Sequence, residues 1–474
     1  MITRRDFLRG MAAASAGLAL SPADFVAAAA ERKAPKSKDK VKIAYIGIGN
    51  RGDQIIHAFA DTGMVEVVAL CDVDLDGPQC EAVLKMYPKA KRFRDFREMF
   101  DKCGNEFEAV AAAVPDFAHF AIVMLCLDQG KHIYVEKPLC RTFNEAELIM
   151  DSARRHPNVV TQMGNQGHSE ENYYQFKAWK EAGFIKDITD VTVHMNDSRR
   201  WHNFDSKMIK PFPAQPLPKN MDWDTWLGPI AWHDYNDAYH QGNWRCWYDM
   251  GMGALGDWGA HLFDTVHEFL ELGLPYEINL KYANGHNDFF YPYSSTILFR
   301  FPQRNGMPPL DLTWYDGLDN LPPLPEHYWD AAGAAADIPA SGQNDGPQSK
   351  LKPGRILYSR DGVVFKGASH GTTLSIVPNE AGLEAMKHAP EVPEPTSNHF
   401  ENFLLAIQGL EKTHSPFEVS GVLAQVFCLG VIAQRLNADL YFDPRTKRFT
   451  NNEFANAMLT GIPPRKGWEQ FYKM

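Results

Sequence analysis

The feature that most constrains this chain is a glycine-rich turn at the end of an unbroken apolar run. Residues 41–49 read VKIAYIGIG, and Gly47, Gly49 and Gly52 follow the spacing G-x-G-x-x-G. An apolar run without alternation predicts a strand buried on both faces, and residues 51–61 have a helical pattern. A strand, a tight glycine turn and a helix in this order predict one unit of a doubly wound parallel sheet.

The same turn predicts a dinucleotide site. The first glycine permits the reversal, the second lets a pyrophosphate approach the backbone, and the third lets the helix pack on the strand. Asn50 and Arg51 lie inside the turn, and Arg51 is expected either to pair with the pyrophosphate or to face solvent. Asp72 ends the next buried run, 20 residues after Gly52. A carboxylate there accepts hydrogen bonds from a ribose 2′-hydroxyl and repels a 2′-phosphate, so we expect NAD rather than NADP.

Patterns farther along predict two domains. Further buried strands are expected at residues 66–72, 108–115, 132–136 and 159–163. Thr142 and Glu145 form a capping box for a helix over 143–155. Alternating buried strands and helices predict an α/β Rossmann domain with a doubly wound parallel sheet over residues 41–165.

The pattern changes over residues 166–474. Strands that alternate polar and apolar residues are expected at 189–196, 276–283, 296–301 and 310–314, with a hairpin over 355–365 that turns at Arg360-Asp361-Gly362. Residues 318–353 have the composition of a long loop, and residues 398–437 return to helix. We therefore expect an α+β domain with a large, mainly antiparallel sheet. One face of that sheet has no obvious covering helices, which predicts a homo-oligomer, a dimer or a tetramer.

Charge and the N-terminal segment bear on partners and location. The net charge of −11 over 474 residues disfavours nucleic acid, and no run of 18 apolar residues predicts a membrane span. The seven cysteines have neither metal-type spacing nor the density of a disulfide framework. Arg4-Arg5, an apolar stretch over 11–20 and small residues at 27–30 predict a Tat signal peptide over 1–30, a linker over 31–40 and a periplasmic location.

Two short motifs supply candidates for chemistry. Glu136-Lys137-Pro138 ends a predicted parallel strand, which places Lys137 at the edge where such sheets bind ligands. Asp257 and His261 are four residues apart and share one face of a helix, where the imidazole can take a hydroxyl proton. No metal is expected, because no third and fourth ligand accompanies this pair. His267 and Glu268 are interpreted as ordinary helix residues.

Tryptophan is concentrated in one part of the chain. Eight of the eleven tryptophans lie between residues 179 and 258, many beside polar residues, and at least half are expected to be core packing. Aromatic faces next to hydrogen-bonding groups suit a sugar, which makes Asp197, Trp244 and Arg245, with Asp257 and His261, candidates for substrate contact.

Together these motifs resemble the Gfo/Idh/MocA family of oxidoreductases. The likeness rests on the turn from Gly47 to Gly52, Asp72, Val114-Pro115-Asp116 with His119, Glu136-Lys137-Pro138, Met163-Gly164-Asn165-Gln166, and Asp257 with His261, and it covers nearly the whole chain after residue 40. The resemblance implies that Pro115, Asp116, His119, Glu136, Lys137, Asn165 and Gln166 lie at the cofactor.

The resemblance also implies chemistry. It makes Lys137 and His261 the catalytic pair, with Asp257 in support, and sugars or inositols the substrates. Exported members of the family hold the dinucleotide tightly, and an NAD-dependent glycosidase branch shares Asn50-Arg51, although the segments beyond residue 165 do not resemble that branch closely. Three hypotheses remain: oxidation of a sugar or glycoside hydroxyl, at C3 in its most specific form; redox-assisted glycoside cleavage with NAD recycled in each turnover; and a non-catalytic sugar-binding protein.

Overall fold

The computed structural model describes residues 40–196, 204–240, 242–331, 351–368 and 370–474. The predicted signal peptide, the linker up to residue 39 and Asp197 lie outside these ranges. The seven cysteines are all described, buried and unpaired.

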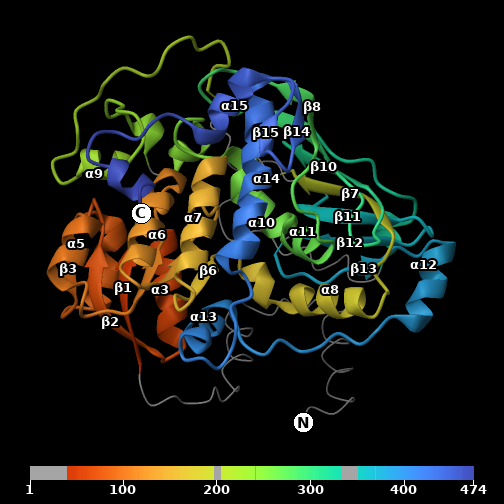
Figure 1. The fold of residues 1–474 in the computed structure, drawn as a ribbon, viewed down its shortest axis with the longest axis horizontal. Coiled ribbons are helices and arrows are strands. Elements are labelled where there is room, and N and C mark those ends of the chain that lie inside the picture. Colours follow the sequence, from red (N-terminus) through yellow and green to blue (C-terminus); the bar gives the residue numbers. More distant parts are fainter. Residues whose placement is uncertain (1–39, 197–203, 241, 332–350, 369) are drawn as a thin grey trace. The chain divides into compact units, whose positions relative to one another are not determined.

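The first sheet is parallel throughout, as predicted, with strand order β3-β2-β1-β4-β5-β6 (Figure 1). Its strands are β1 Val41–Ile46, β2 Val65–Cys71, β3 Lys91–Phe93, β4 Ala109–Ala112, β5 His132–Val135 and β6 Thr161–Met163. The predicted strands are confirmed, and most are shorter than expected because the chain leaves the sheet at the turns that carry the site. β3 was not predicted, since its three residues are KRF with two exposed and give no pattern.

Helices connect these strands. They are α3 Arg51–Asp61, α4 Glu81–Met86, α5 Phe96–Cys103, α6 Asp116–Asp128 and α7 Phe143–Arg155. The capping box that starts α7 is confirmed: the Glu145 N–H donates to Thr142 Oγ1 (3.1 Å), and the Thr142 N–H donates to Glu145 Oε2 (3.1 Å).

The second sheet has nine strands in the order β13-β12-β11-β7-β10-β9-β8-β14-β15. They are β7 Ile188–Met195, β8 Glu277–Asn284, β9 Ser294–Phe301, β10 Leu310–Asp316, β11 Gly354–Ser359, β12 Val364–Ala368, β13 Ser375–Ile376, β14 Asp439–Asp443 and β15 Arg448–Phe449. Only β7 and β10 pair in parallel, which confirms a mainly antiparallel sheet. The predicted hairpin is β11–β12.

One expectation about this sheet needs correction. β10 alternates as predicted, but β9 is buried along nearly its whole length, so it is not amphipathic. The sheet face without covering helices is partly covered by loop residues. At the β11–β12 end Tyr328 and Leu351 pack on Ile356 and Val364. Both covering residues belong to the described parts of the predicted long loop, 318–331 and 351–353.

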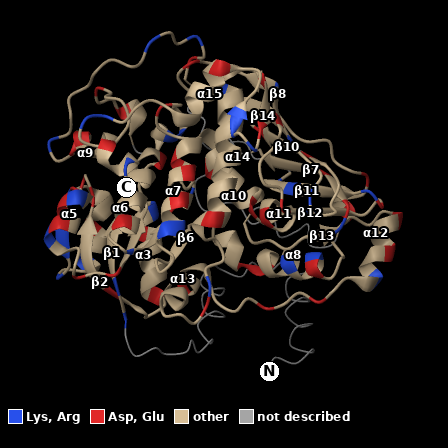
Figure 2. Ribbon diagram, viewed as in Figure 1, with Lys and Arg blue, Asp and Glu red and all other residues tan. Residues whose placement is uncertain are grey.

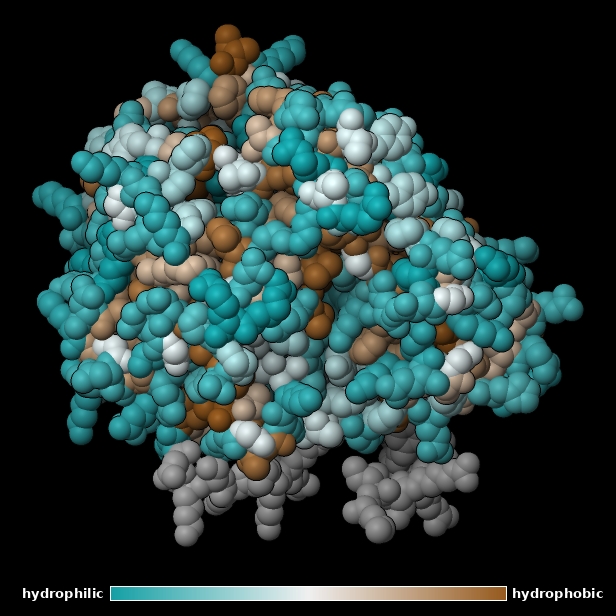
Figure 3. Space-filling model, viewed as in Figure 1, coloured by the Kyte–Doolittle hydropathy of each residue, from teal (hydrophilic) through white to brown (hydrophobic). Residues whose placement is uncertain are grey.

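The remaining helices are α8 Glu171–Glu181, α9 Trp223–Leu227, α10 Gly253–Leu262, α11 Asp264–Phe269, α12 Glu380–Ala385, α13 His399–Ile407, α14 Phe417–Leu436 and α15 Glu453–Thr460. Both signs of charge lie side by side on surface helices such as α5, α7 and α12 (Figure 2). The visible face is mostly hydrophilic with small apolar patches (Figure 3).

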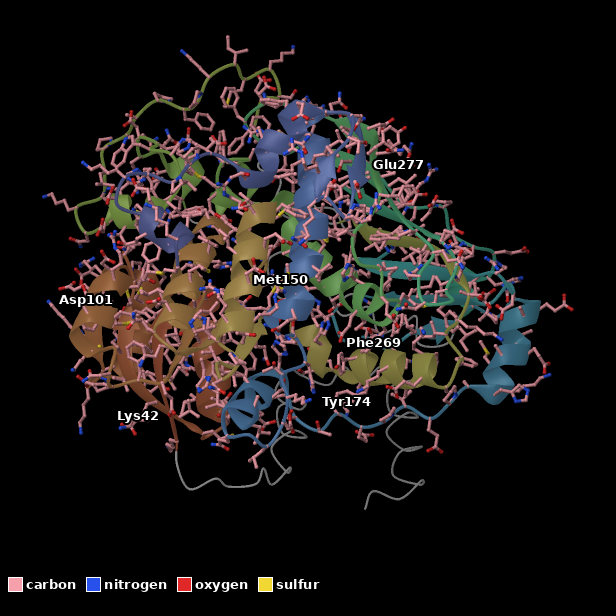
Figure 4. All side chains as sticks on the ribbon, viewed as in Figure 1. Lys42, Asp101, Met150, Tyr174, Phe269 and Glu277 are labelled. Atoms are coloured by element: carbon pink, nitrogen blue, oxygen red, sulfur yellow. The ribbon has the colours of Figure 1, made fainter. Side chains whose placement is uncertain are left out.

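The C-terminal helices join the two sheets. α14 runs between α7 and the second sheet (Figure 1), and it approaches α7 closely because Gly421 leaves room for Met150 (Figure 4). Phe403 and Leu404 of α13 complete the core on the α3 side of the first sheet. The predicted boundary at residue 165 therefore separates the two sheets, but elements after residue 398 pack on both.

Among the residues that the structure describes, α14 alone is long and apolar enough, by length and composition, to cross a membrane, with a mean hydropathy of 1.6. Of its apolar stretch, 78% is buried within the fold, so this helix packs in the protein core.

Candidate active site

The glycine-rich turn is shaped to receive a ligand. Gly47 has φ +77°, and a Cβ added to it would lie 2.3 Å from the carbonyl oxygen of Ala113. A Cβ on Gly52 would lie 2.0 Å from the oxygen of Gly47. Gly49 is different, since a Cβ there would meet only the flexible side chain of Gln79. The turn thus holds the start of α3 against the ends of β1 and β4, where first-turn N–H groups bind phosphate.

Asp72 follows β2 and reaches this turn. Its Oδ2 accepts the N–H of Ile48 (2.9 Å), and its Oδ1 accepts the N–H of Asp74 (3.0 Å). The carboxylate therefore holds the turn in place. It also lies where a ribose 2′-hydroxyl is bound in folds of this type. The glycine cradle and this carboxylate fit NAD.

Arg51 is 39% exposed at its side chain and is bound within the protein. Its Nε and Nη2 both lie 3.1 Å from Glu136 Oε1, and its Nη1 donates to Gln54 Oε1 (3.0 Å). Gln166 Nε2 reaches the same Glu136 oxygen at 3.4 Å. The carboxylate of Glu136 thus ties the glycine turn to the ends of β5 and β6.

Lys137 and Asp257 form an ion pair between the two domains. Lys137 Nζ lies 2.7 Å from Asp257 Oδ1 and 3.0 Å from the Asp257 carbonyl oxygen, although the residues are 120 positions apart. The exposed fraction of the Lys137 side chain is 14% and that of Asp257 is 3%. Arg245 Nε is 3.6 Å from the same carboxylate oxygen. A carboxylate between two cations holds both in place.

Asp116 lies behind this pair. It is buried at the start of α6, and its Oδ2 accepts the N–H of Met252 (3.1 Å). Burial raises the pKa of Asp116 to about 7, opposed by the charge of Arg245 and reinforced by that of Asp257. Asp116 thus joins α6 to the residue before α10, and a proton on it stabilises the site near neutral pH.

His261 lies one turn beyond Asp257 on α10, as the spacing predicts. It is 4% exposed, and its Nδ1 is buried without a hydrogen-bond partner among the described atoms. Burial holds the pKa of His261 well below its usual value, and the charges of His370 and Lys137 lower it further. His261 is therefore a neutral imidazole, and its Nδ1 is closed to solvent and makes no hydrogen bond to the described residues.

His370 belongs to the site and was not predicted. Its ring stacks on that of His261 with centroids 4.3 Å apart, and Trp258 meets it edge-on at 5.4 Å. His370 follows β12 in a short turn that carries no motif, so nothing in the sequence signals it.

Two residues expected to contact the cofactor instead face the protein. His119 is fully buried, with Nδ1 2.7 Å from the Pro138 oxygen and Nε2 2.9 Å from the Val114 oxygen, and burial lowers its pKa to about 4. Asn165 is buried against His168, with Nδ2 2.8 Å from His168 Nδ1. The His119 side chain therefore holds main chain around the site, the Asn165 side chain lies against the His168 ring, and Pro115 is the N-cap of α6.

The tryptophan cluster is mostly core, as expected. Of the seven described tryptophans between residues 179 and 258, only Trp232 is exposed, at 56%. Trp244, a candidate for substrate contact, is 6% exposed and lies 6.4 Å from Phe117, with the Arg245 guanidinium 4.1 Å above its ring. Trp244 thus supports Arg245, and Arg245 reaches the site. Over the described ranges no three His, Cys, Asp or Glu side chains are grouped to hold a metal ion.

His267 and Glu268 were interpreted as ordinary helix residues, and for Glu268 this was wrong. Glu268 Oε2 lies 2.8 Å from His168 Nε2, in a buried group of charges described below. His267 makes a local bond, in which its Nε2 donates to the carbonyl oxygen of Gly273 (2.9 Å).

A Rossmann sheet with an intact glycine turn and a lysine at its carboxyl edge, facing a carboxylate and a histidine from a second domain, defines a class of two-domain dinucleotide-binding proteins. The chain belongs to the Gfo/Idh/MocA family. The family's sequence model described as "Oxidoreductase family, NAD-binding Rossmann fold" matches residues 41–163, and that described as "Oxidoreductase family, C-terminal alpha/beta domain" matches residues 174–301.

Individual relatives are more distant. A glycosyl hydrolase family 109 protein of Shewanella pealeana is 26% identical over 223 residues, which cover 44% of this chain and 49% of the relative. An inositol 2-dehydrogenase/D-chiro-inositol 3-dehydrogenase of Lactiplantibacillus plantarum is 28% identical over 188 residues, 39% of this chain and 52% of the relative. The chain thus spans about half the length of these curated relatives.

Among solved structures, the WlbA dehydrogenase of Chromobacterium violaceum, in complex with NADH and UDP-GlcNAcA, has the same fold. It aligns with a TM-score of 0.56 and 13% identity, over 87% of this chain and 99% of that one.

Proposed function

We propose that this protein oxidises or reduces a hydroxyl carbon of a sugar or glycoside, using NAD bound to the first domain. The observation that carries the proposal is the Lys137–Asp257 ion pair at 2.7 Å, one helical turn from the unpartnered, buried Nδ1 of His261. A charged donor and a neutral acceptor side by side are what the conversion of an alcohol to a ketone requires.

Each residue has a distinct part in this proposal. His261 accepts the hydroxyl proton, because it is neutral and its ring nitrogen has no other partner in the described structure. Lys137 stays protonated beside Asp257 and donates a hydrogen bond to the oxygen as negative charge develops. Asp257 orients Lys137, and Arg245 stabilises the same carboxylate from the far side. Asp197 remains a proposed substrate contact.

NAD would lie on the glycine turn with its ribose at Asp72, and when bound it accepts the hydride that leaves the substrate carbon. Glu136 and Gln166 lie at the ends of β5 and β6, on the edge where the nicotinamide is bound in folds of this type. The hydrogen bonds of Glu136 to Arg51 and to Gln166 would hold that edge still during the reaction.

A second function is supported by the likeness to a glycosyl hydrolase family 109 protein and by Asn50-Arg51 in the turn. Oxidation at C3 of a glycoside acidifies the hydrogen at C2, so a base can expel the aglycone before water adds and the hydride returns. In that cycle no net oxidant is consumed, which suits an exported protein, and Tat export to the periplasm remains our proposal for residues 1–30. Assembly as a homo-oligomer through the second sheet is likewise proposed.

The test uses the protein expressed without residues 1–30 and a panel of glycosides and free sugars, with absorbance followed at 340 nm. Accumulating NADH with a product two hydrogens lighter supports a dehydrogenase. Free sugar and aglycone without net NADH support redox-assisted hydrolysis. No product from any substrate, with NAD shown to be bound, would favour a non-catalytic sugar-binding protein.

Replacing Asp72 tests the cofactor assignment. Asp72→Ala should weaken NAD binding by about 10- to 100-fold, the loss expected for hydrogen bonds to a charged group, and should narrow the preference for NAD over NADP. Titration of NADH and NADPH fluorescence measures both. Because Asp72 also holds the Ile48 N–H, a loosened turn would weaken both dinucleotides equally. Exposed Asp76→Ala is the control. An unchanged NADPH to NADH ratio would contradict the assignment.

A further inference from the structure

Behind the catalytic helix α10, four charged side chains form a connected group in the interior. We call it the buried charge cluster, and its members are His168, Asp264, Glu268 and Arg355. The exposed fraction is 0% for the His168 and Arg355 side chains, 1% for Asp264 and 23% for Glu268. Two positive and two negative groups balance, so removal of any one leaves a charge in the interior without compensation.

At one end of the buried charge cluster, His168 lies next to the residues on the cofactor side of the site. His168 Nδ1 lies 3.1 Å from Asp264 Oδ2, and Nε2 lies 2.8 Å from Glu268 Oε2. Both ring nitrogens lie within hydrogen-bond distance of carboxylates, and as an imidazolium the ring donates to both. Burial alone lowers the pKa of His168, but the bonds and charges of Asp264 and Glu268 outweigh it and raise the pKa to about 10. The side chain of Asn165, next to Gln166, lies against this ring.

The other end holds the catalytic helix. Arg355 Nη1 donates to the carbonyl oxygen of Leu262 (3.1 Å) and to that of His261 (3.4 Å), and it lies 3.6 Å from Asp264 Oδ1. Arg355 Nη2 donates to Asn172 Oδ1. Carbonyls in the last turn of a helix carry partial negative charge, so a guanidinium there stabilises the helix end. Arg355 therefore acts on the main chain of His261 itself.

We propose that the buried charge cluster is a positioning device, which sets His261 against the NAD-binding edge of the first sheet. It runs from Asn165, after β6, through α11 to the end of α10, and so spans the two domains that the reaction must bring together. This inference rests on the proposed function, since it assigns His261 to proton transfer. The chain of contacts predicts that the charge state of His168 changes the environment of the His261 ring.

The histidines around His168 add no positive charge near neutral pH, whereas Glu170 is a further acidic group close to the cluster. Helices α8 and α11 lie side by side, with Phe269 between them (Figure 4), and its ring is 5.1 Å from that of Tyr173. Burial lowers the pKa of the neighbouring histidines, to about 4 for His267 and about 3 for His399, and lowers that of His414. The groups that face the cluster are Tyr173 and Glu170 around α8, His267 on α11, His399 on α13, and His414.

Glu268→Gln is the test, because it removes one charge, keeps an oxygen as acceptor and lies at the partly exposed end. The pKa of His168 should then fall from about 10 into the range of an ordinary assay. At pH values above the pKa of His168 in this variant, kcat should fall about 100-fold, which is the cost of misplacing a catalytic group by about 1 Å. The substrate is the sugar or glycoside that the wild-type protein turns over in the panel described above. The KM for NAD should not change. Wild type and the exposed control Glu271→Gln should keep flat profiles there.

A readout without turnover separates this inference from the proposed function. Protein labelled with ¹³C at histidine Cε1 is titrated by NMR, and His168→Gln and His261→Asn assign the two signals. In Glu268→Gln the His261 signal should shift at the pKa of His168. Such a shift in a protein that turns over no sugar would support the positioning device and overturn the proposed reaction.

The inference would be overturned if the profiles of kcat against pH for Glu268→Gln and wild type coincide and the His261 signal does not shift. Should Glu268→Gln fail to fold, Arg355→Lys keeps the charge but cannot bond both carbonyls. It should lower kcat about 100-fold while NADH binding, measured by fluorescence, stays as in wild type. Full activity in Arg355→Lys would equally contradict the inference.

Discussion

Replacing Lys137 with methionine is expected to leave NAD binding intact and to lower kcat by about 1,000-fold, in the middle of the range for a general acid or base. The ammonium group is the donor beside the reacting oxygen, and methionine keeps the length of the side chain without the charge. Stopped-flow absorbance at 340 nm measures the rate, and NADH fluorescence measures binding.

The same substitution removes the ion-pair partner of the Asp257 carboxylate, which is 3% exposed. Breaking a buried ion pair costs about 3–5 kcal/mol of the free energy of unfolding, and Arg245 at 3.6 Å offsets part of this. The double variant Lys137→Met with Asp257→Asn removes both charges and should recover stability without recovering turnover. Exposed Lys102→Met is the matched control. Full activity in Lys137→Met would exclude the proposed mechanism.

The stability of this protein is expected to fall on acidification before its exposed carboxylates are protonated. Burial lowers the pKa of His119, His194 and His267 to about 4 and that of His399 to about 3, against 6.5 when unfolded. A histidine with a lowered folded pKa contributes stability that is complete above pH 6.5 and is lost as the pH falls toward the folded value. Protonation of each of these four histidines lowers the free energy of unfolding by about 3 kcal/mol or more by pH 4.

Two buried carboxyls act in the opposite direction. Burial raises the pKa of Asp116 to about 7 and that of Asp316 to about 6, so protonation of the folded state favours it on acidification. Two such groups offset only part of the loss from four histidines. The free energy of unfolding should therefore fall by several kcal/mol between pH 6.5 and 4.

Urea unfolding at pH 7.5, 6 and 4.5, followed by circular dichroism, measures this fall. The variant His194→Gln removes one titrating ring on β7, so its loss between pH 7.5 and 4.5 should be smaller than that of wild type by about 3 kcal/mol. His57→Gln, at an exposed ring on α3, is the control. A free energy that stays constant over this range would show that the rings do not titrate as their burial predicts.

The parts of this protein that could be predicted from its sequence are those specified by residues close together in the chain. The glycine turn, the Thr142–Glu145 capping box and the Asp257–His261 pair each depend on spacings of a few residues, which local geometry makes reliable. Buried strands could likewise be read from apolar runs, but β3, with three residues of which two are exposed, has no such signal.

The tertiary structure alone decided which distant charged and polar groups meet. Arg51 pairs with Glu136 across 85 positions, Lys137 with Asp257 across 120, and Asn172 with Arg355 across 183. It also brought His370 onto His261 and turned His119 and Asn165 toward the interior. A charged residue has the same local pattern whether it faces water or a buried partner. Its partner is chosen by how the two sheets and α14 pack, because only there does loss of solvent make an ion pair necessary.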